Sequence, residues 1–330
     1  MKRKYYYTLV VLFILSVSSA WAQQNIQFTQ YMFNSLSINP AYAGYKEEWF
    51  VQGTTRNQWV GFSGAPKTSQ LSVDGIVNPD NKRIGLGLQI TSDVLGPQST
   101  TSFYANYAYR LQLDAEDTKR LCFGLAAGVT QYTLAGTQLD AIDKTDLTVL
   151  NAGGTNYIPD FRFGVYYSSP KWYIGVSILD MFSSNILKIE SAYSDNIIRH
   201  PNLYVIAGSM FEFSDNIKFR PGILYKEDFK GLSVLDVNGM LIYKNKFWLG
   251  GTYRTSFVPW SKNYLIGSGY RYRNSISPIV QLYITEDIRL GYSFDYTITG
   301  LEFAQHGTHE VTIGWTIPSR SQRLLSPRFF

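Results

Sequence analysis

The sequence predicts an all-β protein: a transmembrane antiparallel β-barrel of 14 strands in the bacterial outer membrane. Three observations predict it: an export signal at the amino terminus, many segments in which bulky apolar residues alternate with small or polar ones, and connections that are short and long in turn. Beyond the export signal, no segment reaches the roughly 20 apolar residues of a membrane-spanning helix. The many Tyr, Phe and Gly residues fit a wall in which only alternate residues face lipid.

The first element is a secretory signal peptide at residues 1–22. A basic start, Lys2 to Lys4, precedes the apolar run Leu9–Val17 and the small-residue site Ala20–Ala22, after which cleavage is expected. Its removal takes away three basic residues and no acidic one, which lowers the formal net charge from +5 to +2. The basic composition is therefore no argument for a nucleic-acid partner.

The rest of the chain divides into three parts. Residues 23–47 are too irregular for a spanning strand and are expected to form an N-terminal lead that lies in the periplasm or enters and plugs the barrel. The barrel is expected at residues 48–317, with its first strand beginning near Glu48 and its last ending near Ile317. Residues 318–330 form a periplasmic tail, because prolines cannot donate to a strand ladder. Both termini are thus expected in the periplasm.

Four segments show the alternation clearly: Ile84–Thr91, Leu121–Thr130, Ile288–Tyr296 and Val311–Ile317. The bulky row of each is expected to face lipid and the small or polar row to face the lumen. Strands of soluble sandwiches commonly have about five or six residues, whereas these runs are often long enough to cross a bilayer at a tilt. Aromatic residues near the run ends are expected to form girdles at the water interfaces: Tyr107, Tyr109, Trp172, Tyr173, Phe247 and Trp248.

The connections predict the orientation of the barrel. Short periplasmic turns are expected at Asn78–Lys82, Asp114–Lys119, Ser169–Lys171, Ser214–Asn216, Lys244–Lys246 and Thr285–Asp287. Longer outer loops are expected at Tyr132–Asn156, Met181–His200 and Phe257–Ser275. Within the last of them, Asn263–Arg273 is strand-like and is assigned to an outer loop or a strand extension. Because loops carry specificity on rigid scaffolds, these three loops are candidate contacts for a partner.

The sequence predicts no catalytic residue, no cofactor site and no metal site, and hence no enzyme. His200, His306 and His309 lack metal-ligand spacing, and Cys122 is expected to be an inert strand residue. The segment His306–Glu310 is the only compact cluster that offers both histidine and carboxylate. It could serve a hydrolase at the barrel rim, although a polar loop that enters the last strand explains it more simply.

Five arginines fall on rows that face away from lipid: Arg56, Arg110, Arg162, Arg254 and Arg289. Acids such as Asp295 lie on the same rows. These arginines are therefore expected to form paired charges within the barrel wall, or to bind an internal plug or a partner peptide. Gly85 and Gly87 are expected at small lumen-facing positions, not in a phosphate-binding loop.

Two stretches go beyond the features common to barrels. The first is a series of four motifs near the start: Gln27–Asn34, Ile38–Gly44, Arg56–Phe62 and Gly64–Thr68. The second lies near the end, where Leu290–Tyr296 is followed by His309-Glu310-Val311. Together they resemble the PorP/SprF-like family of type IX secretion system outer-membrane proteins, over essentially the whole mature chain.

The resemblance implies an outer-membrane component that helps export or surface attachment of a cognate secreted adhesin-like protein, as in gliding motility. It implies contact with outer-membrane lipid, with that secreted protein, and with periplasmic secretion-ring and peptidoglycan-associated proteins. It brings no cofactor, catalytic residue or nucleic-acid partner. The candidate structural or partner-binding residues are Asn39, Pro40, Ala41, Tyr42, Gly44, Arg56, Asn57, Gln58, Trp59, Gly64, Pro66 and Lys67.

Two alternatives stay open at this point. The Asn39–Gly44 segment combines a rigid bend with a glycine hinge, which suits a segment that starts and plugs the barrel as well as one that binds a partner. The barrel itself could also be a 14-stranded channel for small hydrophobic molecules, plugged by residues 23–46.

Overall fold

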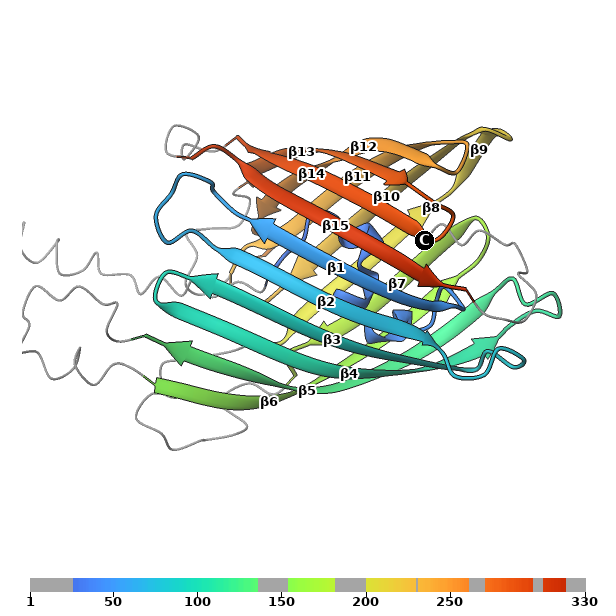
Figure 1. Ribbon diagram of the computed structural model, residues 1–330, viewed down its shortest axis with the longest axis horizontal. Coiled ribbons are helices and arrows are strands. Elements are labelled where there is room, and N and C mark those ends of the chain that lie inside the picture. Colours follow the sequence, from blue (N-terminus) through green and yellow to red (C-terminus); the bar gives the residue numbers. More distant parts are fainter. Residues whose placement is uncertain are drawn as a thin grey trace, which may run out of the picture.

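The computed structural model describes residues 26–135, 154–181, 200–229, 231–260, 271–298 and 305–318. These residues form one antiparallel sheet that closes on itself as a barrel (Figure 1). The strands are β1 (Trp49–Asn57), β2 (Lys67–Ile76), β3 (Ile84–Leu95), β4 (Gln98–Gln112), β5 (Arg120–Leu134), β6 (Gly154–Ser168), β7 (Trp172–Leu179), β8 (Asn202–Ser209), β9 (Phe211–Ser214), β10 (Ile217–Glu227), β11 (Ser233–Tyr243), β12 (Phe247–Phe257), β13 (Arg271–Tyr283), β14 (Ile288–Thr297) and β15 (Thr308–Ile317).

The barrel closes where its first strand meets its last. β1 pairs with β15 from Trp49 opposite Ile317 to Asn57 opposite His309, and each further strand pairs with its neighbour in chain order. β8 and β9 both pair with β10 and continue one another across Met210, so they count as one interrupted strand. The wall therefore has 14 strands, which confirms the predicted architecture.

The ends of the strands confirm the positions of the predicted short turns, and they place a few shorter loops, such as the one between Leu95 and Gln98, among the outer connections. All six predicted short turns fall between strands at the end of the barrel where β1 begins and β15 ends. By the rule for outer-membrane barrels this end faces the periplasm. At the other end β5 and β6 pair as far as Leu134 and Gly154, so the Tyr132–Asn156 loop is shorter than predicted. The strand-like sequence before Arg273 is partly a strand extension, since β13 begins at Arg271.

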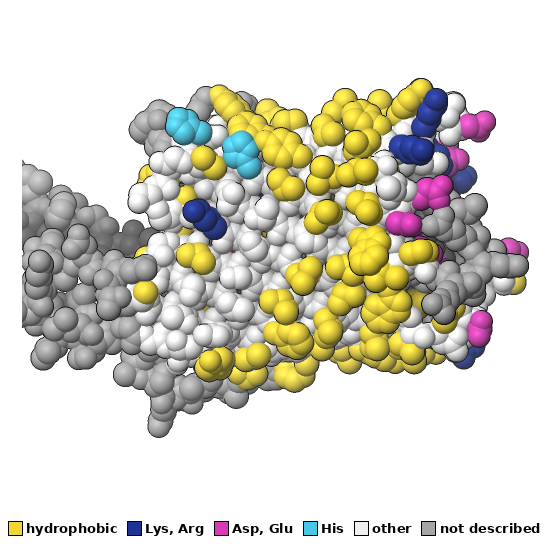
Figure 2. Space-filling view, viewed as in Figure 1, with side chains coloured by type: hydrophobic (Ala, Val, Ile, Leu, Met, Phe, Trp, Pro, Cys, Tyr) yellow, Lys and Arg dark blue, Asp and Glu magenta, His cyan; other side chains and the backbone are white. Residues whose placement is uncertain are grey.

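The wall has an apolar outer face and a polar inner face. In β3, Ile84, Leu86, Leu88 and Ile90 are exposed on the outside, while Gly85, Gly87, Gln89 and Thr91 are buried on the inside. The space-filling view shows hydrophobic side chains across this outer face and charged ones gathered at the periplasmic end (Figure 2). Such a face is suited to hydrocarbon, because alternate strand residues point to opposite sides.

Two residues of the predicted aromatic girdles are on the inner face instead. Tyr107, Tyr109, Trp172 and Phe247 are exposed on the outer wall, whereas Tyr173 and Trp248 are only 2% exposed and point inward. The prediction was wrong for these two because each follows an outward residue directly, and the strand alternation turns it into the lumen.

The N-terminal lead lies inside the barrel (Figure 1). Its described part contains three short 3₁₀ helices, η1 (Tyr31–Phe33), η2 (Ser35–Ser37) and η3 (Pro40–Tyr42). Most of its side chains from Phe28 to Tyr45 are buried. Since the lead hydrogen-bonds to strands on several sides of the barrel, it fills the lumen and supplies much of the core.

No helix within the described ranges is long and apolar enough to span a membrane. The signal peptide and most of the C-terminal tail lie outside the described residues, as do large parts of the three predicted outer loops.

Candidate functional site

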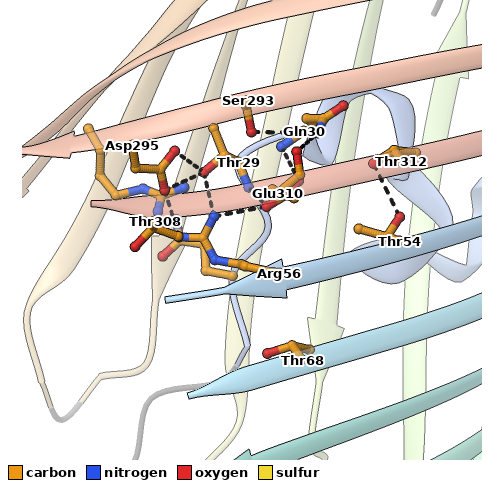
Figure 3. Close-up of polar contacts among 12 residues, drawn as sticks. Thr29, Gln30, Thr54, Arg56, Thr68, Ser293, Asp295, Thr308, Glu310 and Thr312 are labelled. Carbon is orange, nitrogen blue, oxygen red and sulfur yellow. Dashed lines mark hydrogen bonds and ion pairs between the residues drawn. The ribbon is translucent and has the colours of Figure 1, made fainter. Parts of the chain in front are cut away.

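A buried charge cluster joins the lead to three strands in the outer half of the lumen (Figure 3). Arg56 points inward from β1, Asp295 from β14 and Glu310 from β15. The Arg56 guanidinium lies 2.7 Å from Asp295 Oδ2 through Nη2 and 2.9 Å from Glu310 Oε2 through Nη1. One arginine therefore bridges two carboxylates.

The lead completes this cluster. The Thr29 hydroxyl accepts from Arg56 Nη1 at 2.9 Å and donates to Asp295 at 2.8 Å. The backbone N–H groups of Thr29 and Gln30 each donate to one oxygen of Glu310, both at 2.8 Å. The first residues of the lead are thus held by hydrogen bonds to charged groups, which are stronger than neutral ones.

These charges are almost completely withdrawn from solvent. The side chains of Arg56, Asp295 and Glu310 are 4%, 5% and 0% exposed. Burying charges is costly unless opposite charges and hydrogen bonds satisfy them. The lead supplies four of those hydrogen bonds, so its presence lowers the cost of burying these charges in the wall.

A second buried ion pair also contacts the lead's first residues. Arg254 of β12 makes a bidentate contact with Asp236 of β11, with both nitrogen–oxygen distances 2.8 Å. Gln27 Nε2 donates to Asp236 Oδ2 at 3.3 Å, and the Tyr31 hydroxyl accepts from Asn238 Nδ2. The outer half of the lead is therefore held by polar groups of β11 as well as of β14 and β15.

The segment Asn39–Tyr42 folds as its sequence indicates. The Asn39 side chain caps η3 by accepting from Ala41 N–H at 2.9 Å, and Pro40 occupies the first helical position. Asn39 Nδ2 also donates to the carbonyls of Val165 and Val176, at 3.1 and 3.4 Å. One asparagine thus shapes the turn and ties it to β6 and β7.

Glycines of the inner wall leave the room that this segment occupies. A Cβ atom placed on Gly124 would overlap the backbone of Ala41, one on Gly164 would overlap the Asn39 side chain, and one on Gly85 would overlap the carbonyl of Ala43. The small lumen-facing row predicted from sequence therefore has a specific use: it lets the backbone of the lead approach the backbone of the wall.

Aromatic rings fill the lumen between these contacts. Tyr42 and Tyr45 are stacked with ring centroids 4.8 Å apart, and the edges of both meet Tyr166 of β6 at 5.6 and 5.8 Å. Phe33 packs edge-on against Trp248 of β12 at 5.5 Å. These rings belong to one buried apolar cluster formed by the lead and the wall.

The lead leaves the lumen at the periplasmic end through a tight turn. Gly44 has φ +73°, and its N–H donates to Asp74 Oδ2 of β2 at 2.9 Å. Only glycine fits there, because a Cβ atom would lie 2.9 Å from the Cα of Gly85. Glu47 follows and pairs with Lys82 at 2.7 Å, so a salt bridge fixes the point where the chain enters β1.

The outer connection between β1 and β2 contains most of the last two motifs of the series, Arg56–Phe62 and Gly64–Thr68. Its backbone is bound to neighbouring connections: Val60 N–H donates to Gly307 O at 2.9 Å, and Gly96 N–H donates to Gly64 O at 2.9 Å. Trp59 N–H donates to the Thr308 hydroxyl at 3.1 Å. The side chains of Trp59 and Phe62 remain 39% and 55% exposed, so the connection presents aromatic surface at the outer rim.

The candidate residues are thus distributed over three places. Asn39, Pro40, Ala41, Tyr42, Gly44 and Arg56 face the lumen and belong to the packing between lead and wall. Gln58, Trp59, Gly64 and Pro66 lie in the outer connection, and Asn57 and Lys67 sit opposite each other on the outer face of β1 and β2. A partner-binding role for any of them stays a prediction.

Several wall residues that hold the lead were not singled out by sequence reasoning. They are Asp74, Asp236 and Asn238. A polar residue on an inward row of a strand was the available signal, but many such residues exist and only the path of the lead selects among them.

The His306–Glu310 cluster does not form a catalytic arrangement. His309 and Glu310 are consecutive residues of β15, so their side chains point to opposite faces of the wall. Glu310 is buried with Arg56, whereas His309 Nδ1 lies 2.8 Å from the Tyr292 hydroxyl on the outside. Within the described part of the chain, no group of three or more His, Cys, Asp or Glu residues could hold a metal ion.

Comparison with known proteins agrees with the motifs. A model of the type IX secretion system membrane protein PorP/SprF family matches residues 20–315. No curated protein matches the chain. The closed barrel, its apolar outer wall and the match to a family of membrane proteins place the protein in the outer membrane.

Three solved structures of similar fold are distant from this chain in sequence. The CymD monoaromatic hydrocarbon channel has 12% identity over 90% of this chain and 94% of its own, with a TM-score of 0.50. A Pseudomonas aeruginosa FadL homologue has 10% identity, 87% and 94% coverage and a TM-score of 0.47. The Acinetobacter baumannii outer membrane protein Omp33 has 9% identity, 83% and 100% coverage and a TM-score of 0.46. At these identities the likeness concerns the barrel fold alone.

Proposed function

Because the chain belongs to the PorP/SprF family of type IX secretion system membrane proteins, we propose that it is a non-enzymatic barrel that helps a cognate secreted adhesin-like protein to reach or remain on the cell surface. The observation that carries the proposal is the family match, which extends over the lead and nearly the whole barrel. Gliding motility is the type of process in which such an adhesin would act.

The filled lumen supports a role at the surfaces of the barrel. The lead contributes buried tyrosines, a charge cluster and close backbone contacts to the interior. A polypeptide in transit would have to displace all of these together. The secreted protein is therefore expected to be bound at the outer rim, where Trp59 and Phe62 are exposed, and at the predicted outer loops, whose tips lie outside the described residues.

The periplasmic end is the surface for the remaining proposed partners. Charged residues gather at this end (Figure 2), and the salt bridge between Lys82 and Glu47 lies there. We include contact with the secretion ring or its peptidoglycan-associated proteins in the proposal. Export with cleavage after Ala22, which N-terminal sequencing of the mature protein would verify, belongs to it as well.

Deletion of the gene tests the proposal. The surface and culture-fluid proteomes of the deletion strain are compared with those of the parent and of a strain complemented with the wild-type gene. At least one type IX substrate is expected to leave the surface fraction and to return on complementation. Unchanged export and attachment of every type IX substrate would contradict the proposal.

A channel for small hydrophobic molecules is the second candidate, since a hydrocarbon channel has a similar fold. The buried contacts of the lead weigh against it. Purified barrel in liposomes is expected to show neither conductance nor uptake of a monoaromatic hydrocarbon, and deletion of residues 23–46 serves as the opened control. Uptake by the intact protein would favour the channel.

A further inference from the structure

The lead crosses the lumen from the outer end of the barrel to its periplasmic end (Figure 1). Near the outer end, the Thr29 hydroxyl donates to Asp295, the third residue from the outer end of β14. Near the periplasmic end, Gly44 N–H donates to Asp74, the third residue from the periplasmic end of β2. The chain therefore enters β1 from the periplasmic side, and the earlier part of the lead lies on the outer side.

The first described residues of the lead continue toward the outer mouth. Gln27 Nε2 donates to Asp236 Oδ2 at 3.3 Å, and Asp236 is the fourth residue of β11, which begins at the outer end. The side chains from Phe28 to Leu36 are all buried, whereas Ile26 and Gln27 are only partly buried. Exposure thus increases toward the start of the lead, as expected where a chain reaches the mouth of a filled barrel.

The residues ahead of Ile26 are too few to return to the periplasm. Cleavage after Ala22 leaves three residues before Ile26, and these extend over at most about 11 Å. On β1, six residue steps separate Phe50, which pairs with Asp74, from Arg56 of the outer charge cluster. At roughly 2.5 Å of height per residue for a strand tilted by about 40°, the two levels are about 15 Å apart. The buried side chains of the lead also fill the lumen between these levels, so no path leads back.

We propose that the amino terminus of the mature chain lies at the outer mouth of the barrel, on the cell-surface side of the membrane. The lead then crosses the outer membrane once, inside the wall, before the chain turns at Gly44 and enters β1. The inference rests on export with cleavage after Ala22, which is part of the proposed function. It differs from the expectation from sequence that both termini lie in the periplasm, because an irregular segment before the first strand does not indicate the direction in which it runs through the lumen.

This topology sets an order of events in assembly. Pairing of β1 with β15 closes the wall around the lead, and the close contacts between lead and wall leave no space to thread the lead through afterwards. The start of the lead must therefore be free before closure. Signal peptidase frees it by hydrolysis: water is consumed, the peptide bond between Ala22 and Gln23 breaks, and the lead keeps the new amino group. Removal of the signal peptide thus precedes closure of the barrel.

Cysteine labelling in intact cells tests the position of the terminus. Cys122, which is buried in β5, is the only cysteine of the chain, so Cys122→Ala with Gln24→Cys carries a single thiol near the mature amino terminus. A bulky membrane-impermeant maleimide is expected to label the same fraction of this variant before and after the outer membrane is permeabilised. Labelling that requires permeabilisation, or no labelling of the folded barrel in either state, would overturn the proposal.

Two matched variants calibrate the two sides of the membrane. Phe62, in the outer connection between β1 and β2, is 55% exposed, and Phe62→Cys should be labelled in intact cells. Ala115 is exposed in the turn between β4 and β5 at the periplasmic end, and Ala115→Cys should be labelled only after permeabilisation. Both variants also carry Cys122→Ala, and heat-modifiable mobility in gels shows that each barrel is folded.

Amino-terminal sequencing separates this proposal from the proposed function. If cleavage occurs after Ala22 and Gln24→Cys is labelled only after permeabilisation, the topology proposal fails alone. A chain that keeps its signal peptide would contradict both. If deletion of the gene leaves export of every type IX substrate unchanged, the proposed function fails, whereas the labelling result still decides where the terminus lies.

A fusion between Ala22 and Gln23 tests the order of assembly. A compact domain that folds in the periplasm is too wide to follow the lead through the lumen, so its fusion is expected to abolish the heat-modifiable barrel. The control is a variant of the same domain that cannot fold, which has the same length and should retain the barrel. Equal yields of folded barrel from the two fusions would contradict the threaded topology.

Discussion

The lead is held differently in the two halves of the lumen. In the outer half, Thr29 and Gln30 are tied by hydrogen bonds to the ion cluster of Arg56, Asp295 and Glu310. In the inner half, Asn39–Tyr45 is held mainly by close packing, with backbone against wall glycines and tyrosine rings against one another. Asn39 and Gly44 add hydrogen bonds to the wall there. The charged side chains of the outer half can be replaced together, so that no charge is left unpaired. A steric clash in the inner half has no such compensating substitution, so the two halves should respond differently to substitution.

Replacing Arg56 should disrupt the contacts that hold the lead in the outer half of the lumen, and its effect on stability should be the largest. Arg56→Met leaves two carboxylates buried without their cation, which is expected to lower the free energy of unfolding by about 3–5 kcal/mol. Urea unfolding of the barrel in lipid, followed by tryptophan fluorescence, measures it.

A balanced variant is the control for this effect. Arg56→Met combined with Asp295→Asn and Glu310→Gln removes all three charges and should regain most of the lost stability. A triple variant as unstable as the single one would mean that the charge cluster is not what holds the outer half.

Adding a side chain at one glycine of the wall should disrupt the packing of the lead in the inner half of the lumen. Gly124→Ala places a methyl group against the backbone of Ala41, and such overpacking is expected to cost about 1–3 kcal/mol. Heat-modifiable mobility and urea unfolding measure it. Gly53→Ala is the matched control, because its methyl group would meet only Ile313, at an ordinary 3.4 Å; equal loss in both variants would show that the lead is not involved.

Asn39 tests how much hydrogen bonding contributes in the inner half, because this one residue both shapes the turn of the lead and binds it to the wall. Asn39→Ala removes the cap on Ala41 N–H and the two bonds to Val165 and Val176, at an expected cost of about 1–2 kcal/mol. Asn39→Asp should be less stable still, since its carboxylate would face those carbonyls. Urea unfolding measures both variants. If Asn39→Asp is as stable as Asn39→Ala or more stable, this account of the inner half is contradicted.

The turn between β4 and β5 lies outside both halves and should show the smallest effect. The Thr118 hydroxyl, followed by the N–H of Lys119, donates to Asp114 and lowers the pKa of that carboxyl below its usual value. The stabilisation is present above the ordinary pKa and is lost as pH falls through the lowered folded-state pKa. Thr118→Val should therefore reduce stability at neutral pH and converge with wild type in strong acid; the measurement is urea unfolding across that range.

The sequence was sufficient to predict the barrel wall, but not the contacts between the wall and the lead inside the lumen. The alternation at Ile84–Thr91 predicted both faces of β3, because strand geometry alone turns successive side chains to opposite sides. The pairing of Arg56 with Glu310 could not be predicted, since 254 positions separate them and only barrel closure brings them together. Tyr173 and Trp248 were assigned to the interface because aromatic residues are frequent there, while their inward direction depends on register.

The sequence by itself determined a barrel with short turns at one end, because hydrophobic periodicity and turn residues act locally. Its motifs also determined the family, which the match over residues 20–315 confirms. Only the tertiary structure decided that the motif series divides between lumen, rim and outer wall. Neighbouring residues such as Arg56 and Asn57 face opposite sides of a strand, and what each one contacts is set by strands and a lead that are far away in the chain.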